Sequence, residues 1–243
     1  MSTQEKKVGN KYLSGHSSIG KEIPLPKGTR WVIGDIHGCI KTLKSLLERI
    51  NLKPEDQLFL LGDYINKGPS SFEVLMEVID MKGSVYPLIG NHDKMLLDYY
   101  LQPTDELKNT LIRLNSRKFV DTDNQTRQLI SNFLGGLPYY YLSGNYILVH
   151  AGFNFELEEV FNDPASMITI KDFGYDTKKV SAKTIIHGHN PKPLNVIQES
   201  INQAEKVLPL DNGCVYEGMM EGVGNLIGLN INRMKILIQP NID

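Results

Sequence analysis

The chain has 243 residues, and its 26 lysines and arginines against 28 aspartates and glutamates give a formal net charge of −2. This near balance provides no basic surface for a nucleic-acid polymer, and no apolar run is long enough to cross a bilayer. The polar start of the chain lacks the apolar core of a signal peptide, and two cysteines are too few for a disulfide framework, so we expect a cytoplasmic protein.

Residues 1–27 are polar and contain glycine, serine and proline, which predicts an N-terminal lead-in before a single domain over 28–243. Within that domain, three apolar segments predict strands that alternate with helices. The strands are Trp31–Asp35, Gln57–Leu61 and Val85–Ile89, and the helices are Cys39–Ile50 and Ser70–Lys82. This alternation predicts strand–helix–strand crossovers between neighbouring parallel strands.

Residues 94–136 follow a different pattern, which predicts a helical insertion or cap over the strand ends. The expected helices are Met95–Leu101, Thr104–Arg117 and Gln125–Leu134. The insertion carries five cations, namely Lys108, Arg113, Arg117, Lys118 and Arg127. A solvated basic face is the ordinary interpretation, and the alternative is that one of them reaches an anionic substrate.

The last part of the chain is predicted to be rich in β-strands. Tyr139–Leu142 and Tyr146–Val149, joined by Ser143, Gly144 and Asn145, predict an antiparallel hairpin and therefore a second sheet. Further short strands are expected at Thr184–Ile186, Leu194–Glu199, Ala204–Leu208, Val215, Leu226–Ile231 and Met234–Gln239. Residues 155–179 show no clear pattern.

Five of the predicted strands end in side chains that can bind a metal ion. These side chains are Asp35, His37, Asp63, Asn91, His150 and His189. The carboxyl ends of strands are where open α/β sheets build their sites. Mixed oxygen and nitrogen donors suit manganese, iron or zinc, and six donors exceed what one catalytic ion needs. Two ions that share Asp63 would fit phosphoester hydrolysis.

His92 directly follows Asn91 in the sequence. Adjacent residues on an extended backbone point in opposite directions, so both are not expected to bind one ion. His92 is better placed to protonate the leaving oxygen as a general acid. His187 precedes the candidate ligand His189 by two residues, and we expect it to support that ligand rather than to bind metal.

Together these motifs resemble those of the calcineurin-like metallophosphoesterases, and most closely the phosphoprotein phosphatase branch. The segments that carry the resemblance are Gly34–Gly38, Gly62–Gly68, Gly90–Asp93, His150–Gly152, Gly188–His189 and Leu210–Val215. The branch includes bacterial serine/threonine protein phosphatases and symmetrical diadenosine tetraphosphatases. The resemblance implies an α/β fold of four layers, with two mixed sheets packed face to face and flanked by helices.

The resemblance also implies two divalent ions, with manganese as the first choice and iron or zinc as alternatives. By motif position, Asp35, His37 and Asp63 hold the first ion. The second ion is held by Asp63, Asn91, His150 and His189. A metal-bridging hydroxide then attacks phosphorus, His92 acts as the general acid, and Asn91 also contacts the phosphate.

Three positions depart from the family pattern. Asn66 replaces an aspartate that pairs with the catalytic histidine, Lys67 replaces an arginine, and Lys171 aligns with a phosphate-binding arginine. Loss of the carboxylate lowers the expected pKa of His92, which reduces the rate on the order of 10–100-fold. Lysine keeps a charge for phosphate but loses the bidentate fork of arginine.

The leading hypothesis is a serine/threonine protein phosphatase that acts on phosphomonoesters, with activity reduced by Asn66 and Lys67. A symmetrical dinucleoside tetraphosphate hydrolase is the alternative enzyme. Its base could stack on tyrosines at Tyr99, Tyr100 and 139–141, although packing is their more ordinary role. A third hypothesis is a pseudophosphatase that binds phosphorylated partners without efficient turnover. The oligomeric state is left open.

Overall fold

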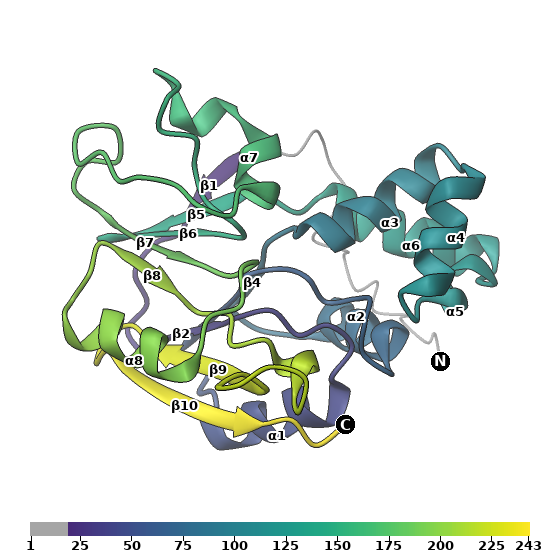
Figure 1. Cartoon of the computed structure of the whole chain (residues 1–243), viewed down its shortest axis with the longest axis horizontal. Helices are drawn as coiled ribbons and strands as arrows, with labels where there is room; N and C mark the ends of the chain where they lie inside the picture. The colour runs from purple at the N-terminus through teal and green to yellow at the C-terminus, as the bar shows by residue number, and fades with distance from the viewer. Residues whose placement is uncertain (1–18) are drawn as a thin grey trace, which may run out of the picture.

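The computed structural model describes residues 19–243, so residues 1–18 of the predicted lead-in lie outside the described residues. Two mixed β-sheets, each with five strands in this part of the chain, are packed face to face (Figure 1). Helices and irregular segments cover their outer faces. This arrangement confirms the expected α/β architecture of two mixed sheets flanked by helices.

The first sheet, in the order β10-β9-β2-β3-β4, holds the three strands predicted near the N-terminus. Strands β2, β3 and β4 are parallel neighbours, whereas β9 runs antiparallel to both β2 and β10. Helices α1 and α2 form the predicted crossovers between the parallel strands. The bounds are β2 Arg30–Ile33, α1 Ile40–Ile50, β3 Gln57–Leu60, α2 Ser71–Asp80, β4 Val85–Pro87, β9 Asn225–Asn230 and β10 Lys235–Pro240.

The second sheet has the order β1-β5-β6-β7-β8. Strands β5 and β6 form the predicted antiparallel hairpin, and β6, β7 and β8 are parallel to one another. Strand β1, which lies inside the predicted lead-in, pairs in parallel with β5. The bounds are β1 Gly20–Glu22, β5 Tyr140–Ser143, β6 Tyr146–Val149, β7 Thr184–His187 and β8 Val207–Pro209.

A buried apolar layer joins the two sheets. Val32 and Phe59 of the first sheet belong to one cluster with Leu148 and Ile186 of the second, and all four are fully buried. Because side chains alternate along a strand, the neighbouring Ile33 packs on the other face, in the cluster that includes α1 and α2. Burial of apolar surface drives this packing, and it fixes the two sheets relative to each other.

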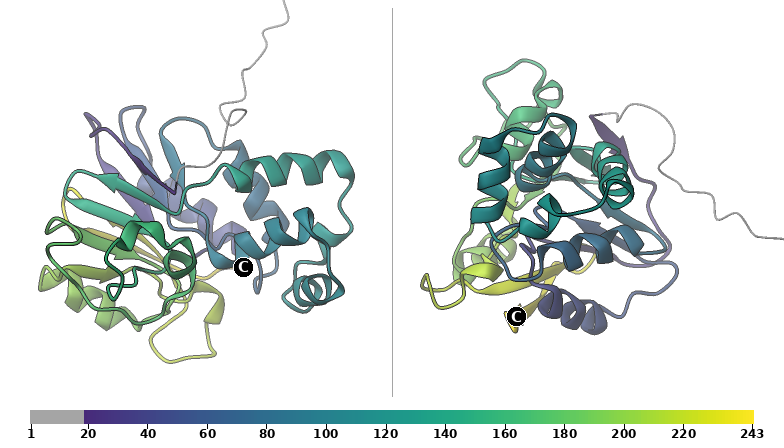
Figure 2. Two further views of the ribbon diagram at one scale, coloured as in Figure 1. Left: turned by 90° about the horizontal axis from the view of Figure 1, so that it is seen from above. Right: turned by 90° about the vertical axis from the view of Figure 1, so that its right-hand side faces the viewer.

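Four helices project from one side of the two sheets (Figures 1 and 2). They are α3 Asn91–Leu101, α4 Asp105–Arg113, α5 Arg117–Val120 and α6 Asn124–Gly135. They lie where the helical insertion was expected, and no strand occurs among them. Helix α3 begins at Asn91, earlier than predicted, so the insertion starts inside a motif that carries candidate ligands.

Two of the short strands predicted near the C-terminus are wrong. Leu194–Glu199 belongs to helix α8 (Leu194–Asn202), and Val215 lies in the 3₁₀ helix η2 (Cys214–Tyr216). Ile197 and Ile201 are one helical turn apart and both are buried, but so short an apolar run fits a strand equally well.

The segment without a clear pattern contains short helical turns that cover the outer face of the second sheet. They are the 3₁₀ helix η1 (Val160–Asn162) and helix α7 (Pro164–Thr169). Val160 and Met167 pack in one apolar cluster with Ile147 and Ile185 of the second sheet. No helix within residues 19–243 is long and apolar enough to cross a membrane.

Candidate metal centre

The candidate ligands gather where strands of both sheets end. Asp35 follows β2 and Asp63 follows β3, while His150 follows β6 and His189 follows β7. Asn91 comes after β4 as the first residue of α3. Because the sheets are packed face to face, side chains from both reach one site. These residues, which are dispersed in the sequence, therefore lie together in the structure.

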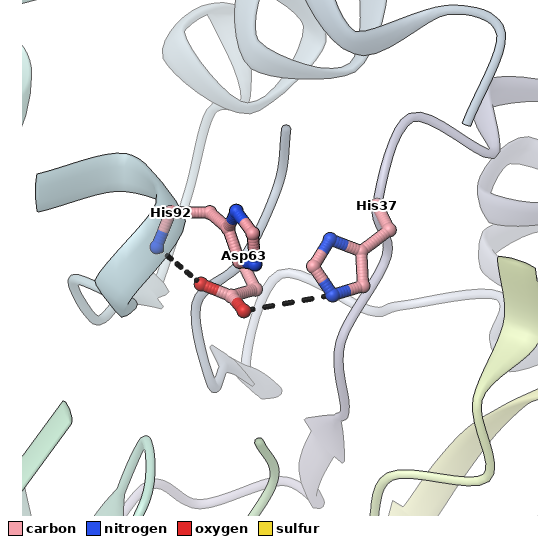
Figure 3. A group of neighbouring side chains, drawn as sticks. All are labelled: His37, Asp63 and His92. Carbon is pink, nitrogen blue, oxygen red and sulfur yellow. Dashed lines mark hydrogen bonds and ion pairs between the residues drawn. The ribbon is translucent and has the colours of Figure 1, made fainter. Parts of the chain in front are cut away.

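Asp63 lies at the middle of the site. Its Oδ2 is 3.5 Å from Nε2 of His37 and 3.5 Å from Nε2 of His150. Figure 3 shows His37 facing this carboxylate, with His92 on its other side. Separations near 3.5 Å are long for hydrogen bonds, and they suit donors that each sit about 2 Å from a shared ion.

Backbone contacts orient both imidazoles toward Asp63. Nδ1 of His37 is 2.9 Å from the carbonyl oxygen of Ile65, and Nδ1 of His150 is 3.0 Å from that of Leu61. Nδ1 of each ring therefore carries the proton, and Nε2 presents a lone pair. Two lone pairs thus lie near one carboxylate oxygen, an arrangement that suits a metal ion bound between them.

A second group of donors lies beside the first. Oδ1 of Asn91 is 3.0 Å from Nε2 of His150 and 3.0 Å from Nδ1 of His189. Nε2 of His189 is buried and has no hydrogen-bond partner. The residues Asp63, His150 and His189 can bring one atom each to a shared metal position, and so can His37, Asp63 and His92.

Asp35 connects the two sheets at the site. Its carboxylate oxygens both accept the backbone N–H of His189 at 3.1 Å, and Oδ2 is 4.0 Å from Nε2 of His37. The approach is close because Gly188 has no side chain: a Cβ there would lie 2.0 Å from Asp35 Oδ1. This glycine therefore allows His189, which follows β7, to lie against the carboxylate of Asp35, which follows β2.

The backbone at the site is strained in several places. His37, Asp63, Asn66, Lys67 and His189 all have φ between +46° and +71°, a region that side-chain-bearing residues rarely adopt. Each such residue costs on the order of 1 kcal/mol, and clusters of them are typical of functional sites.

The buried charges call for a cation. Burial raises the pKa of Asp63 to about 7 and that of Asp211 to about 6. It also raises the pKa of Asp35 well above its usual range, with the nearby Asp211 and Asp63 adding to the effect. Burial lowers the pKa of His150 to about 3, so its imidazole is neutral. Neutral imidazoles beside buried carboxylates are the donor set of a divalent metal ion, and these residues fit one.

A sequence model of calcineurin-like phosphoesterases matches residues 29–221. The chain belongs to the calcineurin-like phosphoesterase family. This finding confirms the resemblance carried by the glycine, aspartate and histidine motifs. The family implies divalent metal ions, and the groups around Asp63 are the candidates to hold them.

Curated relatives of this calcineurin-like chain carry the name symmetrical bis(5'-nucleosyl)-tetraphosphatase. The Aromatoleum aromaticum protein is 34% identical over 128 residues, which cover 50% of this chain and 43% of the relative. The Stutzerimonas stutzeri protein is 28% identical over 178 residues, which cover 66% of this chain and 62% of the relative. The chain thus matches about half the length of these relatives.

Solved structures share the fold of this phosphoesterase. A putative diadenosine tetraphosphatase has a TM-score of 0.58 and 23% identity, with 91% of this chain and 98% of that chain covered. A serine/threonine phosphatase of Saccharomyces cerevisiae has a TM-score of 0.58 and 15% identity, with 94% and 84% covered. At these identities the likeness shows a common fold.

His92 and Asn66 form a pair at the edge of the candidate metal centre. His92 is the second residue of α3, so the extended backbone assumed from the sequence is wrong there. Its backbone N–H donates to Oδ1 of Asp63 at 3.0 Å. Nδ1 of its ring is 2.7 Å from Nδ2 of the fully buried Asn66. Burial, followed by the charge of Lys67, lowers the pKa of His92 to about 3.

The two candidate phosphate-binding lysines differ in position. Nζ of Lys67 is 2.8 Å from Nε2 of His37, and it lies over the ring of Tyr216 at 5.3 Å from the centroid. Lys171 is exposed, and its carbonyl oxygen accepts the side-chain N–H of Asn190 at 3.0 Å. The charge of Lys171 contributes to the lowered pKa of His189, so Lys171 is near the site without entering it.

The loop that carries Lys67 is held by the helical insertion. The backbone N–H of Lys67 donates to the carbonyl oxygen of Leu114 at 2.7 Å, and Nδ2 of Asn115 donates to the carbonyl oxygen of Lys67 at 3.3 Å. Leu114 and Asn115 lie between α4 and α5. The insertion therefore positions a site loop through its backbone.

Two cations of the insertion have partners of their own. Nζ of Lys118 is 2.7 Å from a carboxylate oxygen of Glu73, and the guanidinium of Arg127 lies 5.1 Å from the ring centroid of Tyr100. The tyrosines proposed as a base pocket mainly serve packing, since Tyr99, Tyr100 and Tyr141 are at most 9% exposed.

Asp93 supports the site, a role that was not predicted from the sequence. Its carboxylate is fully buried and accepts backbone N–H groups of Asp63 at 2.8 Å, Tyr64 at 3.1 Å and Gly90 at 2.9 Å. These bonds join the loop after β3 to the start of α3. An acidic residue at the third position of a helix that follows a glycine was the available signal, because such a residue caps the helix N-terminus.

Proposed function

We propose that the protein is a metal-dependent phosphoric ester hydrolase. Asp35, His37 and Asp63 would hold one divalent ion, and Asp63, Asn91, His150 and His189 would hold the second. The observation that carries the proposal is the position of Asp63 Oδ2, which is 3.5 Å from Nε2 of His37 and 3.5 Å from Nε2 of His150. Such a shared carboxylate is typical of two-metal phosphoesterases.

When bound, two divalent ions would supply an ionised water as the nucleophile and would neutralise charge on the phosphoryl oxygens. The protein contributes the rest. Asn91 and Lys67 are placed to contact a phosphate group, and Lys171 is near enough to attract one from the surface. His92 would deliver a proton to the leaving oxygen.

The pairing of His92 with Asn66 favours a substrate with a good leaving group. An amide N–H that donates to Nδ1 keeps the ring neutral, and the remaining proton on Nε2 belongs to a weak acid. An alkoxide leaving from phosphoserine or phosphothreonine needs a strong acid. A nucleoside diphosphate leaving from a dinucleoside tetraphosphate is a far weaker base and does not.

We therefore place symmetrical dinucleoside tetraphosphate hydrolysis first and serine/threonine phosphatase activity second, which reverses the order expected from the sequence. The names of the curated relatives support this order. The two cysteines are free and buried, which supports a reducing, cytoplasmic location.

The test compares three substrates with added Mn(II) between pH 5 and 9. We expect turnover of diadenosine tetraphosphate and of p-nitrophenyl phosphate, and much slower turnover of a phosphothreonine peptide. Fast hydrolysis of the peptide alone would restore the protein phosphatase hypothesis. Retention of the peptide without hydrolysis of any substrate would instead indicate a pseudophosphatase.

A further inference from the structure

Lys67 uses the atom of His37 that a metal ion would need. Nδ1 of His37 is 2.9 Å from the carbonyl oxygen of Ile65, so Nδ1 carries the ring proton and Nε2 carries the lone pair. Nζ of Lys67 is 2.8 Å from that Nε2. The ammonium therefore donates a hydrogen bond into this lone pair. One lone pair cannot serve a lysine and a metal ion at the same time.

The backbone of Lys67 is fixed, so only its side chain can move away. Its φ is +70°, its N–H donates to Leu114, and its carbonyl oxygen accepts from Asn115. The ring of Tyr216 lies beside the ammonium, at 5.3 Å from Nζ to the centroid. A rotation within the side chain is the movement that the loop allows.

The ammonium also has no paired anion. The lysine ion pairs within residues 19–243 involve Lys44, Lys94 and Lys118, and no carboxylate oxygen of this part lies within 4.0 Å of Lys67 Nζ. Its charge acts on the buried carboxylates of Asp35 and Asp63 from a longer distance, and opposes the rise in their pKa that burial causes. A charged donor without a carboxylate in contact still has capacity for an anionic partner. The phosphate group of a substrate is such a partner.

We propose that Lys67 competes with a divalent ion for Nε2 of His37. The ion position at His37 is then weaker than the one at His150 and His189, and loading it releases Lys67 to bind substrate phosphate. This inference rests on the proposed function, because it takes the donor groups around Asp63 to be a metal centre. The competition is specific to this protein, because the competing side chain is a lysine where the family resemblance leads us to expect an arginine.

The experiment is a calorimetric titration of the metal-stripped full chain with Mn(II), for the wild type and for Lys67→Gln. We expect two binding steps in the wild type. In Lys67→Gln the weaker step should tighten about tenfold, the effect of losing one charged hydrogen bond, while the other changes by less than about twofold. Lys171→Gln is the matched control, because it removes a nearby lysine charge without a contact to His37, and it should leave the difference between the two steps unchanged.

A double-mutant cycle separates competition from general charge repulsion. In a His37→Gln background, Lys67→Gln should no longer affect Mn(II) affinity. Equal tightening of both steps, or no tightening of either, would overturn the proposal. A second measurement is the ¹⁵N shift of His37 Nε2 in the metal-free chain, which should move when Lys67 is replaced. An unchanged shift also counts against the competition.

These measurements do not depend on turnover. If the chain binds two Mn(II) ions with the expected effect of Lys67→Gln but hydrolyses none of the three substrates, the proposed function fails and the competition stands. If hydrolysis is found and Lys67→Gln binds Mn(II) as the wild type does, only the competition fails. A wild-type chain that binds no Mn(II) removes both.

Discussion

Nδ2 of Asn66 lies 2.7 Å from Nδ1 of His92, where the family resemblance leads us to expect a carboxylate oxygen. The contact fixes the direction of the ring but supplies no negative charge to stabilise an imidazolium. Burial and the charge of Lys67 then lower the pKa of His92 to about 3. Near neutral pH the ring can therefore give up only its Nε2 proton, as a weak acid.

Asn66→Asp should restore the acid. A carboxylate in contact with Nδ1 favours the charged ring and raises the pKa of His92, so the acid form extends to higher pH. We expect kcat on a phosphothreonine peptide at pH 7 to rise about 10–100-fold, with little change on diadenosine tetraphosphate. The pH–rate profiles of both substrates measure this effect. Asn66→Ala is the control, because it removes the contact without adding charge, and an equal gain there would contradict the explanation.

Asp63→Asn should remove the shared carboxylate while keeping the shape of the side chain. An amide cannot bridge two cations as a carboxylate does, so the number of bound ions should fall from two to at most one. Elemental analysis after dialysis against Mn(II) measures the stoichiometry. Asp172→Asn, which changes an exposed carboxylate, should keep both ions. Two retained ions in Asp63→Asn would place the bridge elsewhere.

The stability of the metal-free chain should fall as the pH rises from about 4, where an unfolded aspartate loses its proton, to about 8, where the folded carboxyls have lost theirs. Burial raises the pKa of Asp63 to about 7 and, with the charge of Asp63, that of Asp93 to about 8. The folded state thus holds protons that the unfolded state has already lost, and their contribution disappears as the pH passes the folded pKa. The slope is about 1.4 kcal/mol per pH unit for each carboxyl still protonated. Urea unfolding at several pH values measures it, and saturating Mn(II) should flatten the curve.

Asp243→Ala should destabilise the start of α1. The Asp243 carboxylate accepts the backbone N–H groups of Lys41 at 3.0 Å and Thr42 at 2.9 Å. It therefore caps a helix whose own N-cap residue makes no capping bond with its side chain. Loss of such a cap costs about 1 kcal/mol. Thermal unfolding compared with Asp176→Ala, an acidic residue far along the chain from this helix, measures the difference. Equal melting temperatures would show that the cap contributes nothing.

The residues of the candidate site are marked more clearly in the sequence than the C-terminal fold is. Each strand that leads to the site is a mostly apolar run with a glycine nearby, and an aspartate, asparagine or histidine follows it. Both the position and the chemistry of the site can therefore be recognised in the sequence. The segment at 194–199 carries no such marker. Its apolar residues suit a helix or a strand, and packing of Ile197 and Ile201 decides for the helix.

Contacts between distant residues could not be predicted from the sequence. No role was predicted for Asp93, yet its carboxylate accepts three backbone N–H groups from two loops. Lys67 was expected to keep a charge for phosphate, and its contact with His37 was not predicted. Both contacts depend on the left-handed backbone at Asp63 and Lys67, which sets the directions of the neighbouring groups. The spacing of apolar residues in the sequence does not predict such backbone.

The turn at Leu114 and Asn115 has a consequence for how this protein can change. It forms hydrogen bonds with the backbone N–H and the carbonyl oxygen of Lys67, and it connects helices that lie outside both sheets (Figure 2). Substitutions in those helices can therefore change the position of Lys67, while the candidate metal ligands keep their places at the ends of the strands. Laboratory evolution of α4 and α5 is therefore a route to new substrate preferences that leaves the candidate metal ligands unchanged.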